Sequence, residues 1–243
     1  VYGYLGQRQK SLKYFEQALD QLETIGDRAE QAATLTNLGW VYSDRDSPRA
    51  IAYYQQALAL VEQVGDPLRQ ASILGNLGLE YATSGNYSQA EQAFSRSLKL
   101  TQEVGDRAQE ALALARLGQI AYARKDYLRA ESQLQQALGL IQPLGDRRSA
   151  GFIHLLLGKV QLAANQPKAA ETSLQKGIQT WETIRADLGT NDANKISLFD
   201  QQERAYRLLQ LAQLAQNRPE VALETAERGR ARAFVELLAG RLT

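Results

Sequence analysis

The sequence is poorest in the residues that build reactive sites. Its 243 residues contain no cysteine, no methionine and one histidine, His154. Without cysteine there are no disulfides and no thiolate metal sites. His154 stands in the apolar run 152–157, so we expect it to pack in or on a helix. No catalytic residue, metal site or cofactor is therefore predicted, and the chain is not expected to be an enzyme.

The chain also lacks a large excess of either charge and any long apolar run. Lys and Arg number 28 and Asp and Glu 27, which is not the basic excess that nucleic-acid binding requires. No apolar run approaches the roughly 18 residues of a membrane span, and no signal peptide is visible. We expect neither a nucleic-acid nor a membrane partner, and a cytoplasmic protein. Because the chain begins at Val1 and has no methionine, we expect a segment of a longer protein.

What the chain does have is a repeat of about 40 residues, since three independent markers recur in phase. The first marker is Gly-Asp, the second is Leu-Gly, and the third is a small residue followed by Leu or Ile. They stand at Gly26-Asp27, Gly65-Asp66, Gly105-Asp106 and Gly145-Asp146; at Leu38-Gly39, Leu77-Gly78, Leu117-Gly118 and Leu157-Gly158; and at Ala18-Leu19, Ala57-Leu58, Ser97-Leu98, Ala137-Leu138 and Gly177-Ile178. Such a period predicts stacked supersecondary units that present surfaces.

One unit, residues 66–105, reads as a helical hairpin. Asp66 before Pro67 suits a helix start, and the cluster 84–86 predicts its end. A second helix follows and ends at Gly105, which suits a left-handed cap. Each helix has one apolar face, and small residues at Gly78, Ala90 and Ser97 allow the two helices to approach closely.

This pattern resembles the tetratricopeptide repeat (TPR), and the long period is similar to the repeats of kinesin light chains and of the LGN type. The resemblance implies an all-α fold, a right-handed superhelical α-solenoid of TPR hairpins. It covers residues 1–186, with a truncated first repeat and repeats at about 27–65, 66–105, 106–145 and 146–186. Residues 187–243 are predicted to form a long helical hairpin that caps the array.

The stretch 222–239 resembles the junction between TPR arrays and CHAT domains of bacterial, often cyanobacterial, proteins. CHAT domains are caspase-like, and such a domain would follow Thr243. The resemblance implies a junction to a domain outside this chain. A final capping hairpin with a basic outer face explains the same residues without such a domain. The run Arg228, Arg230 and Arg232 could grip phosphate, but alternate residues of a helix point in different directions.

In TPR stacks one stripe of each first helix lines a concave groove, which gives the candidate site. One stripe position reads Asn37, Asn76, Arg116 and Leu156. Asn can bond both polar groups of a peptide backbone, and Arg can hold a carboxylate. The predicted peptide-binding residues are Asn37, Trp40, Asn76, Arg116, Gln119, Tyr122 and Lys159. The alternative is that they only bond neighbouring helices. The carboxylate clamp of chaperone-binding TPRs is matched in part, but Thr36, Trp40 and Leu112 depart from it.

The predicted function is a protein-interaction scaffold that binds a peptide or partner domain. The change from polar to basic to apolar residues (Phe152, Leu155 and Leu162) suggests an extended ligand with an acidic stretch and an apolar end. The second hypothesis is the regulatory arm of a CHAT protease. The third is a self-assembly module, because a truncated first repeat would expose an apolar face to another chain.

Overall fold

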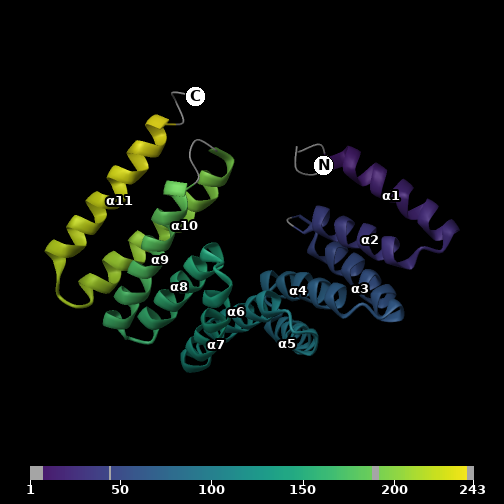
Figure 1. Cartoon of the computed structure of the whole chain (residues 1–243), viewed down its shortest axis with the longest axis horizontal. Helices are drawn as coiled ribbons and strands as arrows, with labels where there is room; N and C mark the ends of the chain where they lie inside the picture. Colours follow the sequence, from purple (N-terminus) through teal and green to yellow (C-terminus); the bar gives the residue numbers. More distant parts are fainter. Residues whose placement is uncertain (1–7, 44, 188–191, 240–243) are drawn as a thin grey trace. The chain divides into compact units, whose positions relative to one another are not determined.

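The computed structural model describes the backbone of residues 8–43, 45–187 and 192–239, and side chains within 10–43, 45–185 and 201–231. These residues form eleven α-helices, one 3-10 helix and no strand. The expectation of an all-α repeat fold is confirmed. The chain divides into an N-terminal unit, residues 1–120, and a C-terminal unit, residues 121–243. The α-helices, labelled in Figure 1, are α1 (Arg8–Ile25), α2 (Arg28–Tyr42), α3 (Ser47–Val64), α4 (Pro67–Thr83), α5 (Tyr87–Val104), α6 (Arg107–Ala123), α7 (Tyr127–Ile141), α8 (Arg147–Ala163), α9 (Pro167–Asp187), α10 (Asp192–Leu214) and α11 (Pro219–Ala239). The 3-10 helix η1 (Gln142–Leu144) directly follows α7.

Each Gly-Asp marker is the junction between two helices. Gly65 ends α3 with a left-handed φ of 76°, and the Asp66 carboxylate then accepts a hydrogen bond from the Arg69 amide at 3.0 Å. Glycine takes that φ without strain, and Asp satisfies an amide that the first helical turn leaves unpaired. The same pairing of glycine and aspartate occurs at Gly26-Asp27, Gly105-Asp106 and Gly145-Asp146.

The glycine of the Leu-Gly marker lets the two helices of a hairpin touch. A Cβ on Gly78 of α4 would lie 2.5 Å from the Phe94 ring of α5, and one on Gly39 of α2 would lie 2.6 Å from the Tyr54 ring of α3. In the C-terminal unit Gly158 of α8 faces Leu174 of α9 in the same way. The other small residues also pack as predicted, because Ala90 is fully buried and Ser97 donates to the Ala71 carbonyl at 2.8 Å.

Both units have cores of buried apolar side chains. In the N-terminal unit, α1 packs on α2, α2 on α3, α3 on α4 and α4 on α5. One core cluster surrounds Tyr54 and another surrounds Phe94. In the C-terminal unit the stack runs from α7 through α8, α9 and α10 to α11. Its core surrounds Leu174 and Trp181. None of the helices in the described segments combines the length and the hydropathy that crossing a bilayer requires.

A buried carboxylate joins two repeats of the N-terminal unit. Glu80 of α4 is only 3% exposed and accepts hydrogen bonds from the hydroxyls of Ser43 and Ser47, the latter at 2.7 Å. The matching position of the next repeat is the buried Ile120. Because a buried carboxylate needs its hydrogen bonds, α4 is tied to the α2–α3 turn by these two serines.

Candidate functional site

Five of the predicted binding residues lie in the N-terminal unit, on the first helix of each hairpin. We call them the first-helix stripe: Asn37 and Trp40 on α2, Asn76 on α4, and Arg116 and Gln119 on α6. Asn37 is exposed, Trp40 is 53% exposed, and the other three are half-buried. The hydrophobic core therefore leaves all five at least partly accessible to a ligand.

Arg116 is the electrostatically unusual member of the first-helix stripe. Burial lowers the pKa of its guanidinium below the ordinary value of arginine. In the described part of the chain its one hydrogen bond runs from NH1 to Oε1 of Gln119, at 3.3 Å, and it has no carboxylate partner. A desolvated cation without a counter-charge is costly, so this position favours an anionic group from elsewhere.

The two remaining predicted residues meet inside the C-terminal unit. Nζ of Lys159, on α8, lies 4.5 Å from the centroid of the Tyr122 ring, a cation–π contact. The Tyr127 ring is tilted against Tyr122, with centroids 5.9 Å apart. One prediction for this helix is wrong: Leu155 does not line a groove but is 6% exposed in the core with Leu174. Its face of α8 is covered by α9.

His154 packs, as predicted from its apolar surroundings. It is 6% exposed, and its Nδ1 is buried without a hydrogen-bond partner. Burial first, and the charge of Lys176 second, lower the pKa of the imidazole. Its ring is therefore neutral near pH 7. The described residues contain no group of three or more His, Cys, Asp or Glu side chains that could hold a metal ion.

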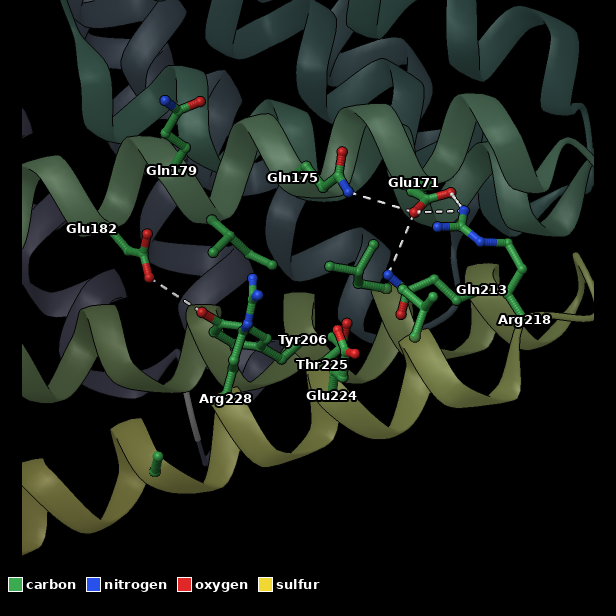
Figure 2. A pocket seen from close by; sticks show the side chains of 14 residues that line it. Glu171, Gln175, Gln179, Glu182, Tyr206, Gln213, Arg218, Glu224, Thr225 and Arg228 are labelled. Atoms are coloured by element: carbon green, nitrogen blue, oxygen red, sulfur yellow. Dashed lines mark hydrogen bonds and ion pairs between the residues drawn. The ribbon is translucent and has the colours of Figure 1, made fainter.

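A second candidate site is a cleft of about 770 Å³ in the C-terminal unit, which the sequence reading missed. Its floor comes from α10 and its two sides from α9 and α11 (Figure 2). Its apolar lining residues include Ile178 of α9 and Leu209 of α10, and the sides are rich in amides and charges. We call it the α9–α11 cleft.

One end of the α9–α11 cleft is held by Glu171 of α9. Its carboxylate accepts hydrogen bonds from Gln213 at 3.4 Å, from Gln216 at 2.8 Å and from Arg218 at 2.9 Å. Figure 2 shows Gln213 and Arg218 converging on it. This cluster fastens the α10–α11 turn to α9. Oε1 of Gln213 has no partner among the described groups, although the residue is 2% exposed, and such an unmet acceptor costs about 1–3 kcal/mol.

The other end of the α9–α11 cleft lies around Arg228 of α11. Arg228 reaches from α11 across the cleft, beside Tyr206 of α10 (Figure 2). The Tyr206 hydroxyl donates to Glu182 of α9 at 3.2 Å. Arg228 has no ion pair in the described part of the chain, and Arg230 is exposed and does not line the cleft. The predicted divergence of these two arginines is thus confirmed, while the Arg232 side chain lies outside the described ones.

The repeat and its hairpins have known relatives. Residues 1–63, 45–103 and 69–142 match the tetratricopeptide repeat family, and together these matches cover more than half of the 243 residues. The chain belongs to the tetratricopeptide repeat family. This TPR chain is also 43% identical over 63 residues to Tetratricopeptide repeat protein 28 of Mus musculus, which is 26% of this chain but 3% of that protein.

Solved structures with low identity share the TPR fold. BtubC (BKLC) from P. vanneervenii has a TM-score of 0.78 at 17% identity, over 94% of this chain and 92% of that one. A putative kinesin light chain of Podosopora anserina with nearly identical TPR-like repeats has a TM-score of 0.65 at 14% identity, over 84% and 95%. The likeness to kinesin light chain repeats is consistent with the roughly 40-residue period.

The α9–α11 cleft belongs to the part of the TPR chain where the sequence period ends. The signals that could have indicated it are the break in the repeat after Trp181 and the glutamines Gln175 and Gln179 on one face of α9. Neither signal is specific in a sequence, because exposed glutamines are common on helices. The cleft becomes recognisable only when α11 is placed opposite α9.

Proposed function

We propose that this TPR protein is a non-catalytic protein-interaction scaffold whose first-helix stripe binds an acidic segment of a partner protein. The observation that carries the proposal is Arg116, half-buried and without a carboxylate partner in the described part of the chain. Asn76 on the neighbouring first helix offers an amide for the ligand backbone, and Trp40 offers an exposed aromatic surface of the kind found at interface hot spots. Lys159 and Tyr122 are proposed as further ligand-binding residues within the C-terminal unit.

The test compares two arginine substitutions on the full chain. Labelled hexapeptides that alternate Glu with Ala, and matched peptides with Gln in place of Glu, are titrated by fluorescence anisotropy. Arg116→Gln should weaken binding of the Glu peptide by about tenfold, the loss of one charge-assisted hydrogen-bonded pair. Arg45→Gln, at an exposed position outside the stripe, is the matched control and should leave binding unchanged.

Thermal melting separates a binding role from a structural one. A buried charge without a partner destabilises the fold, so Arg116→Gln should melt no lower than the parent chain. A lower melting temperature together with unchanged peptide binding would show that Arg116 and Asn76 only support neighbouring helices.

The C-terminal hairpin is proposed to cap the array. Ala222 and Thr225 of α11 are buried, and Gly229 lies against Tyr206 of α10, so α11 covers a face that would otherwise meet water. Three further apolar residues of the helix sequence that support the cap proposal, Phe234, Leu237 and Leu238, lie outside the described side chains. A chain that stops at residue 216 should aggregate or lose cooperative unfolding. Unchanged monomeric behaviour would contradict the cap.

Proposals on location, excluded partners and a further domain rest on the amino-acid sequence alone. The protein is proposed to be cytoplasmic, to bind neither nucleic acid nor a membrane, and to be joined to a CHAT domain in a longer bacterial protein. Self-association through the first repeat is tested by light scattering across a concentration series. A mass that doubles with concentration supports a self-assembly module, and a constant monomer mass contradicts it.

A further inference from the structure

The α9–α11 cleft combines a cation without an ion pair in the described part of the chain, side-chain amides and apolar lining residues. Glu171 is not available to a ligand, because Gln213, Gln216 and Arg218 already bond it. The unused groups therefore gather at the other end, between Gln179 of α9 and Arg228 of α11. Neither side chain has a hydrogen-bond partner in the described part of the chain.

The amides along α9 have the spacing of an extended peptide. Gln175 and Gln179 stand one helical turn apart and both line the cleft, so their Cα atoms are separated by about 6 Å along the axis. In an extended chain every second peptide group recurs after about 6.6–6.8 Å. Nε2 of Gln175 donates to Glu171 at 3.5 Å, which leaves its Oε1 and one N–H for a ligand, whereas the Gln179 side chain has no hydrogen bond in the described part of the chain. A side-chain amide both donates and accepts hydrogen bonds, so the two glutamines can bond alternate peptide groups of one extended segment.

The charges of the cleft limit what that segment can carry. Arg228 is an exposed donor without an ion pair in the described part of the chain, whereas Glu182 and Glu224 line the same space. A single carboxylate placed at Arg228 gains a charge-assisted pair. A run of acidic residues would be repelled by the two glutamates, and a basic side chain would be repelled by Arg228.

We propose that the α9–α11 cleft is a second binding site, for an extended and otherwise uncharged peptide segment that bears one carboxylate. Arg228 binds the carboxylate, Gln175 and Gln179 bond the peptide backbone, and apolar side chains of the segment lie on Ile178 and Leu209. The site is separate from the first-helix stripe and does not depend on it.

The test uses the full chain and labelled hexapeptides built from Ala, Leu and Ser with one Glu at each position in turn. Parallel sets carry Gln or Lys at that position, and a further set has no Glu but a free rather than amidated C-terminus. The Glu set reports a side-chain carboxylate and the free-acid set a chain-end carboxylate. Binding of one of these two sets, and at least about tenfold weaker binding of the Gln set, is expected.

Variants then locate the binding. Arg228→Gln should weaken the bound peptide by about tenfold, while Arg230→Gln, on the same helix but outside the cleft, should change it by less than about twofold. Gln179→Ala should weaken it too, and Arg116→Gln should not. The proposal is overturned if no peptide binds, if the Lys set binds best, or if Arg228→Gln and Arg230→Gln behave alike. Loss of binding in Arg116→Gln alone would assign the peptide to the first-helix stripe instead.

Discussion

The hairpin α4–α5 and the final hairpin α10–α11 each place a glycine of one helix against an aromatic side chain of the other. The two hairpins differ in which helix carries the glycine and in how closely the helices approach. In α4–α5 the glycine, Gly78, is on the first helix and receives the Phe94 ring of the second at a distance that leaves no room for a Cβ. In α10–α11 the glycine, Gly229, is on the second helix, and a Cβ there would lie 3.4 Å from Tyr206 of the first. The first pair is closed, whereas the second borders a cleft of about 770 Å³. Close backbone approach thus fills the space within the α4–α5 hairpin, whereas the looser α10–α11 hairpin lies beside space that a ligand could occupy.

The largest difference between the two hairpins is expected from removing their aromatic rings. Phe94→Ala should cost about 3–5 kcal/mol of unfolding free energy, because the ring is 1% exposed and the close-packed hairpin cannot fill the cavity. Tyr206→Ala should cost less, since Tyr206 lines the cleft and water can enter the space. Urea unfolding followed by circular dichroism measures both. Equal losses would mean that the two hairpins pack equally tightly.

Adding one methyl group should separate the hairpins further. Gly78→Ala should lose about 1–3 kcal/mol through overpacking against Phe94. Gly75→Ala, three residues earlier in α4 where nothing lies within 4 Å of the new Cβ, should instead gain up to about 1 kcal/mol from helix propensity. Gly229→Ala should resemble Gly75→Ala. The comparison fails if Gly78 and Gly229 respond alike in thermal melting.

The free energy of unfolding should depend on Glu171, which holds one end of the α9–α11 cleft together. Glu171→Ala should cost about 1–3 kcal/mol, because it leaves the Gln213 amide and the Arg218 guanidinium without their acceptor. The control is Glu203→Ala, which breaks an exposed pair with Arg207 on one helix and should cost about 0–1 kcal/mol. Denaturant midpoints of the two variants measure the two losses of stability. Similar values would reduce Glu171 to a surface contact.

The smallest effect is a pH dependence confined to the C-terminal unit. His154 has a lowered pKa when folded and an ordinary value of 6.5 when unfolded, so protonation favours the unfolded chain. The stability from this residue should be complete above about pH 6.5 and should fall as the pH drops toward the lowered folded pKa. Trp181, 1% exposed in the same unit, reports it in a Trp40→Phe background. His154→Asn should remove the dependence, and persistence of the dependence in that variant would exclude His154 as its cause.

Much of the fold could be predicted because its determinants are local and repeated. Gly65 and Asp66 act within one turn of the chain, as a left-handed helix end and an amide acceptor, and their recurrence identified the helix junctions. The sequence also carries local signals for the last helix, Pro219–Ala239, in the proline at its start and the apolar residues that follow it. These features need no distant partner to be read.

The candidate sites depend on distant partners and were predicted only in part. The exposure of Trp40 and of Asn37 follows from helical periodicity. The isolation of Arg116 from carboxylates does not, because it depends on which side chains of other helices fail to reach it. Leu155 was assigned to the wrong surface, since its face of α8 is covered by α9, and periodicity within α8 cannot show which neighbour covers which face.

The amino-acid sequence by itself determined the helices, their ends and the close contact within each repeated hairpin, because caps, apolar periodicity and the marker glycines act over a few residues or recur in phase. Only the tertiary structure decided that Glu80 is buried between two serines, that Glu171 gathers donors from α10 and the turn before α11, and that Arg228 faces an open cleft. Those contacts join residues about 33–47 positions apart, so they exist only once separate helices have packed and excluded water between them.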